Sequence, residues 1–389
     1  MTRSVSDSRP AYEGFEQGPI RPPSEAYSLL IRVTRNCPWN RCRFCPVYKG
    51  SRFSLRPVDH VLRDIDAVHR YVQALRSSAG ERKTLSREDL RAVGEQIVPA
   101  DNGAFHAALQ WFAGGMASIF LQDANSLILP PQELIRVLQH LKLRFPWVER
   151  ITSYARSHTV ARISGEDLSK MAAAGLNRIH IGMESGSDAV LERMKKGVTQ
   201  SGHIQAGLKI KTAGMELSEY VMPGLGGREL SREHALDTAE ALNRINPDFI
   251  RMRTLAIRNH TELAEDRDSG RFEKLTDAET ADEILRFLDR LDGIDSEVKS
   301  DHLLNLFQEV EGRLPGDAER MKEPIRRFLD LPGEERMLYQ VGRRMGYFHS
   351  LADMASSSRR AQAEQACRTW GITPENVDEK IEEIMKRFI

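Results

Sequence analysis

The sequence lacks long apolar runs. No segment of its 389 residues approaches the ~18 consecutive apolar residues that a membrane helix needs, and residues 1–23 contain no apolar signal core. We therefore expect a cytoplasmic protein that does not cross a membrane. An excess of positive charge is also absent, because Lys and Arg number 56 and Asp and Glu number 56. This balance argues against binding duplex nucleic acid through bulk charge.

Cysteine is scarce as well. Of the four cysteines, Cys37, Cys42 and Cys45 fall within nine residues, and Cys367 stands alone near the C-terminus. A disulfide framework usually spreads an even number of cysteines along a short chain. A tight triplet in a long chain without a signal segment instead predicts a metal site in a reducing compartment.

Apolar, β-rich runs alternate with helical patterns between residues 27 and 257, which predicts an α/β fold of parallel β-α units. The expected strands are Tyr27–Thr34, Ser118–Asp123, Arg150–Tyr154, Arg178–Met183, Leu217–Met222 and Phe249–Leu255. The expected helices between them are Val58–Leu75, Pro131–Leu143, Asp167–Ala174, Ile204–Ala213 and Glu233–Ile245. The pattern alone fits both an open sheet and a barrel.

Composition divides the chain into three parts. Residues 1–26 form an extended lead-in, residues 27–257 the α/β core with a helical insertion at 76–114, and residues 258–389 a helical C-terminal region. No strand is expected after about residue 260. The helices expected there are Thr280–Leu291, Asp301–Glu311, Ala318–Leu329, Glu334–Met345 and Pro374–Arg387. The polar residues His302, Asn305 and Glu309 would then form one stripe that faces either the substrate or solvent.

The cysteine triplet follows the first expected strand, at the end where β-α proteins place their chemistry. Three thiolates on a short loop can ligate three irons of a [4Fe–4S] cube and leave the fourth iron for a ligand. A structural zinc site would need a fourth protein ligand nearby, and His60 is the nearest downstream histidine. Unrelated buried thiols are the third alternative.

The loop Cys37-Pro-Trp-Asn-Arg-Cys42-Arg-Phe44-Cys45 resembles the cluster motif of the radical S-adenosylmethionine (SAM) superfamily. Most members have C-x3-C-x2-C, whereas this chain has C-x4-C-x2-C and keeps the family's aromatic position at Phe44. The resemblance covers roughly residues 27–257. Within the superfamily, the sequence is similar to the branch with oxygen-independent coproporphyrinogen oxidases and elongator-type cores. It implies a partial (β/α)6 TIM-like barrel with a helical insertion and a helical C-terminal extension.

The resemblance also implies two cofactors, a [4Fe–4S] cluster on Cys37, Cys42 and Cys45, and SAM on its open iron. One electron would cleave SAM to a 5′-deoxyadenosyl radical, which abstracts hydrogen from the substrate. The expected SAM contacts are Phe44 beside the cluster, Asp123 for the amino group, Glu184 for the ribose, Ser185 for the carboxylate, and the inward-pointing Glu219.

The last expected strand carries two positively charged side chains. Arg251 and Arg253 lie on one face of it, because strand side chains alternate. Facing a barrel interior, they would need anions. The SAM carboxylate, Glu184, Glu219 or an anionic substrate would serve for both arginines, and Arg253 is the expected SAM contact. The alternative is that both arginines pair with internal carboxylates and touch no ligand.

Two functions compete. The first is a radical SAM enzyme whose substrate is unidentified and is a small molecule, a peptide or a nucleic-acid base. The resemblance implies reduced flavodoxin or ferredoxin as its electron donor, and no membrane partner. The second is a non-catalytic or electron-transfer iron–sulfur protein, although such a carrier normally has a fourth cysteine near the triplet.

Overall fold

The computed structural model describes residues 11–82, 84–95, 97 and 101–385. The chain divides into two compact units. The first unit takes in the described parts of residues 1–38, 50–180 and 212–215, and the second unit takes in those of residues 39–49, 181–211 and 216–389. Strand β6, Leu176–Glu184, begins in the first unit and ends in the second.

The strands of the first unit run in the order β1-β4-β5-β6. Strand β1 (Leu29–Arg32) pairs in parallel with β4 (Ser118–Gln122), and β4 pairs in parallel with β5 (Arg150–Ala155). All five residues of β4 are buried, as expected for a central parallel strand. The short strands β2 (Thr34–Arg35) and β3 (Ser54–Leu55) form a separate antiparallel pair.

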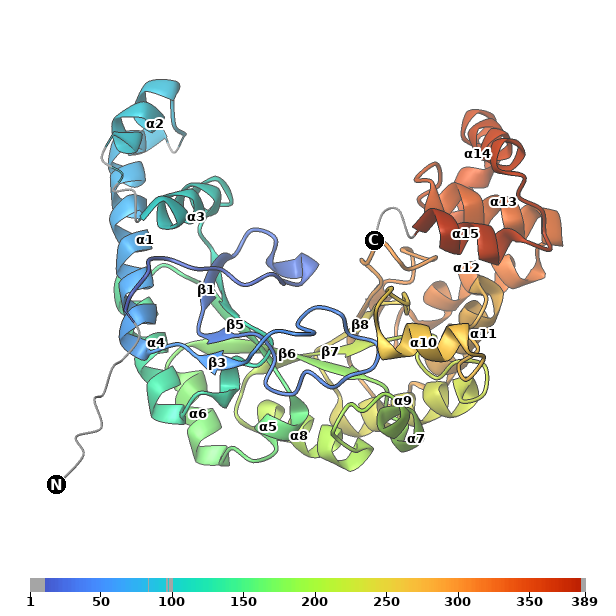
Figure 1. Cartoon of the computed structure of the whole chain (residues 1–389), viewed down its shortest axis with the longest axis horizontal. Coiled ribbons are helices and arrows are strands. Elements are labelled where there is room, and N and C mark those ends of the chain that lie inside the picture. Colours follow the sequence, from blue (N-terminus) through green and yellow to red (C-terminus); the bar gives the residue numbers. More distant parts are fainter. Residues whose placement is uncertain (1–10, 83, 96, 98–100, 386–389) are drawn as a thin grey trace. The chain divides into compact units, whose positions relative to one another are not determined.

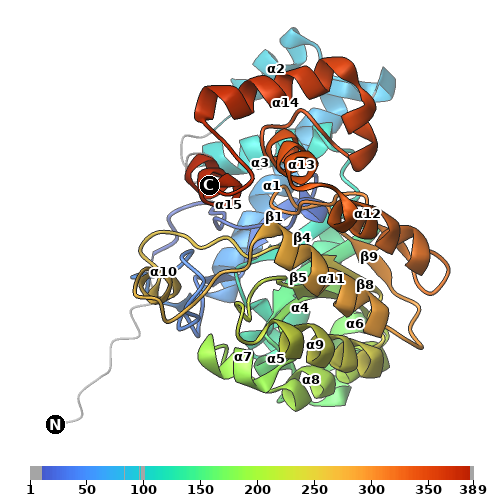
Figure 2. The same cartoon turned by 90° about the vertical axis from the view of Figure 1, so that its right-hand side faces the viewer.

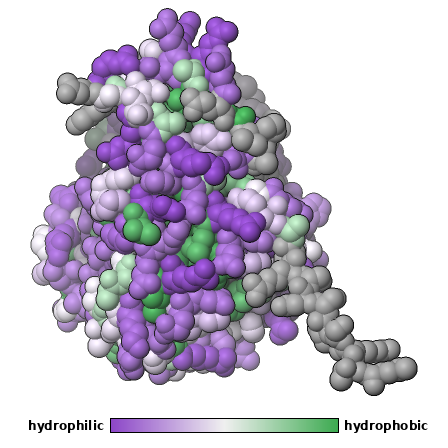
Figure 3. All heavy atoms as spheres, turned by 90° about the vertical axis from the view of Figure 1, so that its left-hand side faces the viewer, coloured by the Kyte–Doolittle hydropathy of each residue, from purple (hydrophilic) through white to green (hydrophobic). Residues whose placement is uncertain are grey.

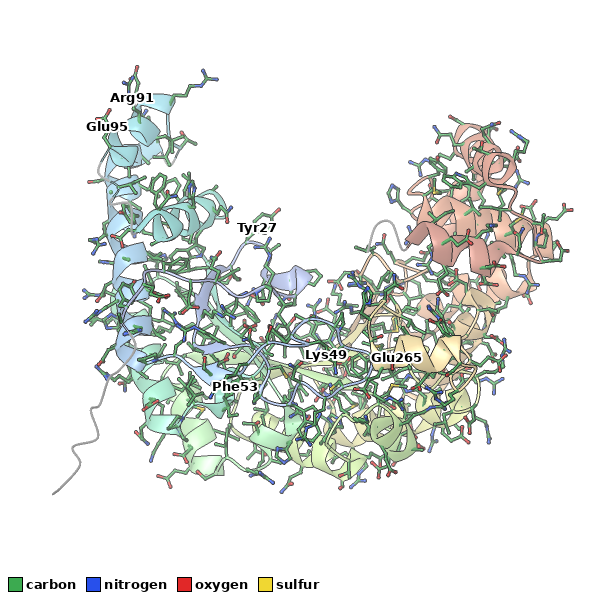
Figure 4. All side chains as sticks on the ribbon, in the orientation of Figure 1. Tyr27, Lys49, Phe53, Arg91, Glu95 and Glu265 are labelled. Atoms are coloured by element: carbon green, nitrogen blue, oxygen red, sulfur yellow. The ribbon has the colours of Figure 1, made fainter. Side chains whose placement is uncertain are left out.

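The helices of the first unit follow the expected pattern. They are α1 (Val58–Ala79), α2 (Arg87–Gly94), α3 (Asn102–Ala113), α4 (Pro131–Arg144), α5 (Ser157–Val160) and α6 (Gly165–Ala173). Helices α2 and α3 make most of the described part of the insertion helical. Helix α3 packs against α1 (Figure 1). The exposed pair Arg91 and Glu95 marks the end of α2 (Figure 4), with Nε and Oε1 3.4 Å apart.

The described part of the N-terminal lead-in, residues 11–26, contains one turn of 3-10 helix, Pro23–Glu25. Side-chain contacts hold this segment to the first unit. The Tyr12 hydroxyl donates to Asp64 over 2.8 Å, and the amide of Gln122 binds backbone atoms of Gly18 and Ile20. The first ten residues of the expected lead-in lie outside the described residues.

The strands of the second unit run in the order β6-β7-β8-β9-β10. Strands β7 (Glu216–Val221), β8 (Phe249–Met252) and β9 (Glu297–Lys299) are parallel, and β10 (Gly312–Arg313) is antiparallel to β9. The expectation of no strand after about residue 260 was therefore wrong. Two of the three residues of β9 are charged, so only the buried Val298 signals a strand.

Helices occupy most of the remaining second unit. They are α7 (Asp188–Arg193), α8 (Gln200–Thr212), α9 (Ser231–Ile245), α10 (Glu262–Asp268), α11 (Asp277–Arg290), α12 (Ala318–Asp330), α13 (Gly333–Arg344), α14 (Ser357–Trp370) and α15 (Val377–Met385). Helices α13 and α14 lie side by side (Figures 1 and 2), although the sequence analysis did not anticipate α14. The last two residues of the expected helix Pro374–Arg387 lie outside the described residues.

The prediction of a helix at Asp301–Glu311 was wrong, because this segment consists of turns and bends without regular secondary structure. The Asn305 side chain accepts from the backbone N–H of Thr254 over 2.9 Å and donates to the carbonyl of Met252 over 2.8 Å. Glu309 accepts from the N–H of Leu351 over 2.9 Å. Asn305 and Glu309 of the supposed stripe thus bind backbone of other segments, whereas Nδ1 of His302 accepts from the N–H of Leu304 in the same segment over 3.2 Å.

The α/β class is confirmed, since the strands are mostly parallel and helices connect them. The partial barrel stays a prediction, as do the domain boundaries at 26 and 257. Among the described helices, none is long and apolar enough to span a membrane. Figure 3 shows one face of the molecule, on which hydrophilic residues predominate.

Candidate cofactor site

The cysteine loop follows β2. Cys37 belongs to the first unit, and Cys42 and Cys45 belong to the second. All three thiols are half-buried, whereas Cys367 is buried in α14. Within the second unit, the N–H of Cys45 donates to the carbonyl of Cys42 over 3.4 Å, which closes a tight turn between these two cysteines. Among the described residues, no three His, Cys, Asp or Glu side chains are arranged to hold a single metal ion.

Backbone hydrogen bonds hold the second half of the loop between α7 and α10. The N–H of Arg43 donates to the carbonyl of Met194 over 3.1 Å, and the N–H of Leu263 donates to the carbonyl of Arg43 over 3.1 Å. The indole N–H of Trp39 donates to the carbonyl of Lys195 over 2.7 Å. The end of α7 and the start of α10 therefore fix the position of Cys42 and Cys45 within this unit.

Phe44 joins the loop to the core of the second unit. Its ring packs against a buried apolar cluster that includes Met222, Leu255 and Leu263. The ammonium nitrogen of Lys196 lies 5.8 Å from the centroid of the Phe44 ring, within the range of a cation–π contact. The predicted role of Phe44 beside the cofactor stays a prediction, and its packing anchors the loop.

Glu184, expected to contact the SAM ribose, is the last residue of β6 and has a φ of 65°, which is uncommon for a residue other than glycine. Its Oε1 lies 3.1 Å from the ammonium nitrogen of Lys196, and both side chains are largely buried. Gly182 leaves room for this pair, since a Cβ there would collide with Oε1 of Glu184. The sequence analysis missed Lys196, which lies beyond α7 in a run of two lysines.

Glu219 lies on β7 and is fully buried. Neither carboxyl oxygen has a hydrogen-bond partner among the described residues. Burial raises the pKa of Glu219 well above its usual range, Lys196 opposes this rise, and the negative charge of Glu184 adds to it. In the absence of a ligand, this carboxyl group therefore favours the neutral form.

Ser185, expected to bind the SAM carboxylate, is fully buried in a hydrogen-bond chain. Its Oγ lies 2.8 Å from Nδ1 of His234, whose Nε2 lies 3.0 Å from the carbonyl oxygen of Met222. A carbonyl only accepts, so Nε2 carries a proton, and in neutral His234 Nδ1 accepts from the Ser185 hydroxyl. The Ser185 oxygen also accepts from the N–H of Ser187 over 3.0 Å.

This chain of contacts continues to the turn after β7. The N–H of Gly224 donates to Oε1 of Glu283 over 2.6 Å, and Glu283 and His234 approach to 3.7 Å. His234 and Glu283 thus fix the ends of β6 and β7 together. The sequence analysis missed both residues, because each comes from a distant helix and belongs to no short motif.

The remaining predicted contacts have protein partners or lie at the surface. Asp123, in the first unit, is fully buried and accepts from Arg32 over 2.8 Å and from the N–H of Asn36 over 3.2 Å. Arg253 is exposed, whereas Arg251 pairs with Asp301 over 2.8 Å. The internal pairing considered for these arginines therefore holds for Arg251. The SAM contacts of Asp123 and Arg253 stay predictions.

Comparisons with known proteins agree with the motif. The family model described as the radical SAM superfamily matches residues 31–242, which is more than half of the chain. A curated relative, 4′-phospho-dehydrooxetanocin synthase of Priestia megaterium, is 27% identical over 195 residues, which are 49% of this chain and 22% of that protein. The chain therefore spans about a fifth of the length of this curated relative.

Two solved structures resemble this chain. Elp3 of the archaeon Methanocaldococcus infernus is 16% identical with a TM-score of 0.40, over 55% of this chain and 53% of that one. Methylornithine synthase is 12% identical with a TM-score of 0.43, over 76% of this chain and 68% of that one. The match over residues 31–242 decides the family: the chain belongs to the radical SAM superfamily, whose enzymes use a [4Fe–4S] cluster and SAM.

Proposed function

We propose that this chain is an enzyme that binds a [4Fe–4S] cluster through Cys37, Cys42 and Cys45 and reductively cleaves SAM to act on a small molecule. The observation that carries the proposal is the buried Glu219 carboxyl group, which lacks a hydrogen-bond partner among the described residues. Such a group is costly to bury unless a ligand completes its contacts. SAM carries an ammonium and a sulfonium group, so it fits this acid.

The donor set also fits the cluster. Cysteine thiolates are the usual ligands of a [4Fe–4S] cube, and three of them leave one iron open. Arg43 supports the ligand loop through its backbone and through an ion pair with Asp266 of 2.5 Å. Held by Cys37, Cys42 and Cys45, the cluster would supply one-electron chemistry for the reductive cleavage of SAM. The protein positions the two cofactors and excludes water from them.

The acids and the lysine of the second unit would bind and orient SAM. Glu184 would accept from the ribose hydroxyls. The ammonium nitrogen of Lys196, 3.1 Å from Oε1 of Glu184, would hold the Glu184 carboxylate in place. Glu219 would release its proton when a cation arrives, because positive charge favours the ionised carboxylate. Ser185 would reach the SAM carboxylate as a donor only if His234 gave up its hydrogen bond.

The electron would come from reduced flavodoxin or ferredoxin. Arg41 is exposed within the ligand loop. Lys49 (Figure 4) and Lys195 belong to the same unit, and both pair with Glu262, so two cations share one carboxylate there. Their positive charge suits an acidic donor protein, since complementary charge speeds association. We infer a cytoplasmic enzyme, because such donors and the reducing conditions that the cluster needs are typical of that compartment.

The test is anaerobic reconstitution of the full chain followed by reduction with dithionite in the presence of SAM. The proposal expects 5′-deoxyadenosine and methionine in equal amounts. An iron–sulfur protein without catalysis would keep its cluster and release neither product. A cluster-loaded chain that leaves SAM intact would therefore contradict the proposed function and support the electron-transfer alternative.

A further inference from the structure

A cavity of about 670 Å³ lies within the second unit, beyond the carboxyl ends of β7 and β8. Pro46 borders it from the cysteine loop, Gly224 from the turn after β7, and Leu255 and Arg258 from the segment after β8. Ile381 of α15 lines another side. The volume is typical of sites for small molecules, and parallel strands usually place such sites at these ends.

The cavity and the cysteine loop contact the same apolar residues. Leu255 and Ile257 line it and also belong to the apolar cluster against which Phe44 packs. Pro46 directly follows Cys45 in the sequence. A molecule in the cavity would therefore share a wall with the loop that carries two of the cluster ligands.

Most charged groups around the cavity already have partners. Arg267 and Lys274 pair with Glu382 at 2.5 and 3.3 Å, and Arg344 pairs with Asp277 at 2.7 Å. Asp378 of α15 accepts from the N–H of Asp277 over 3.0 Å and from Gln340 over 3.2 Å. These pairs tie α15 to α10, α11 and α13 and engage three of the four cations that line the cavity.

Arg258 is different. Its half-buried side chain lines the cavity, and among the described residues no carboxylate pairs with its guanidinium group. A guanidinium group offers five N–H donors in a planar arrangement that matches carboxylate and phosphate oxygens. One cation without a carboxylate partner therefore lines a cavity whose walls are partly apolar.

We propose that this cavity is the substrate site and that Arg258 binds an anionic group, a carboxylate or a phosphate, on a small substrate with an apolar body. The inference rests on the proposed function, because it assigns the molecule in the cavity to the reaction at the neighbouring loop. Leu255, Ile257, Leu275 and Ile381 would contact the apolar body, since all four are buried cavity-lining residues.

The test measures binding of two probes, phenyl phosphate and 3-phenylpropanoate, to the anaerobically reconstituted full chain by calorimetry. The wild type should bind at least one probe, and the tighter arm distinguishes a phosphate ester from a carboxylic acid. Arg258→Gln should weaken binding roughly ten- to a hundredfold, because it removes hydrogen bonds between charged groups. Arg232→Gln, an exposed arginine on α9 outside the cavity, should bind as the wild type does.

Ala256→Phe provides a second variant, because it places bulk in the cavity wall without changing a charge. It should also abolish probe binding. A wild type that binds neither probe, or equal binding after Arg258→Gln, would overturn the inference. Iron content and SAM cleavage of the same wild-type sample separate the two proposals. Intact SAM cleavage without Arg258-dependent binding contradicts only the cavity assignment. Arg258-dependent binding without SAM cleavage contradicts the proposed function and, with it, the substrate role of the cavity, and leaves Arg258 as an anion site only.

Discussion

The ammonium nitrogen of Lys196 lies 3.1 Å from Oε1 of Glu184, and both side chains are shielded, with exposed fractions of 12% and 15%. The same ammonium group lies over the Phe44 ring. Lys196 thus connects the end of β6 to the loop that carries Cys42 and Cys45. Removing Lys196 would leave the largely buried Glu184 carboxylate without this cation. The loss of folding free energy is larger than for an exposed ion pair.

Lys196→Met should therefore weaken SAM binding roughly ten- to a hundredfold, since one hydrogen bond to a charged group contributes ~1.5–3 kcal/mol. Equilibrium dialysis on the reconstituted protein measures the affinity, and the visible spectrum reports whether the cluster persists. Lys195→Met is the matched control, because the Lys195 side chain is half exposed and pairs with Glu262 instead. Equal SAM affinity of the two variants would refute the role given to Lys196.

SAM binding should release a proton from Glu219. Burial raises the pKa of this group, so it is protonated in the free protein over a pH range where an ordinary glutamate is ionised. A bound cation lowers that pKa. SAM affinity should therefore increase as the pH rises from about 4.5 towards the raised pKa.

Calorimetry in buffers of different ionisation enthalpy counts the released protons. Glu219→Gln should remove this release, because an amide does not titrate, and should weaken binding as well. A release that persists unchanged in Glu219→Gln would assign the proton to another group.

His234→Leu should destabilise the protein, because it leaves the buried Ser185 O–H without its acceptor and removes one of the two N–H donors to the Met222 carbonyl. A buried donor left unsatisfied costs about 1–3 kcal/mol. The urea midpoint of unfolding measures the loss, and His234→Gln should lose less because its amide can still donate. Identical midpoints for the wild type and His234→Leu would show that the chain through Ser185 contributes nothing to stability.

Stability should also depend on His302 in mildly acidic solution. Burial, with a smaller effect of nearby Arg253, lowers the pKa of His302 to about 4. The unfolded chain binds this proton near pH 6.5. The stability due to neutral His302 is thus complete above about pH 6.5 and is lost as the pH falls towards 4.

Urea midpoints at about pH 5 and pH 7.5 reveal this dependence. His302→Gln should show a smaller difference between the two than the wild type. His106→Gln, an exposed histidine on α3, should keep the wild-type difference. The same pH dependence in His302→Gln as in the wild type would contradict the assignment.

The sequence predicted the strands of the parallel sheet well, because buried parallel strands contain apolar runs such as Ile119–Leu121 within β4. It did not predict β9, where Glu297 and Lys299 flank one buried valine. It assigned a helix to Asp301–Glu311 because apolar residues there fit a helical face. The bonds that Asn305 makes to the backbone of a distant strand end are invisible in a local pattern.

The site was predictable to a similar extent. The spacing of the cysteines predicts the triplet Cys37, Cys42 and Cys45. The positions of Glu184 and Glu219 on expected strands predict these two acids. No such signal predicts Lys196, His234 and Glu283, because their importance arises from partners that the fold brings together. Arg258 follows the last expected strand, and only the cavity beside it distinguishes it from other half-buried arginines.

The central claim is that the cysteine triplet holds the cluster at which SAM is cleaved. The most direct measurement is iron and sulfide content, together with 5′-deoxyadenosine formation, in Cys37→Ala, Cys42→Ala and Cys45→Ala after anaerobic reconstitution. The account predicts about four irons per chain and SAM cleavage for the wild type and for Cys367→Ala, because Cys367 is buried in α14, far along the chain. Each triplet variant should lose the stable cluster or the cleavage. A full iron content with undiminished 5′-deoxyadenosine formation in Cys37→Ala would contradict the claim.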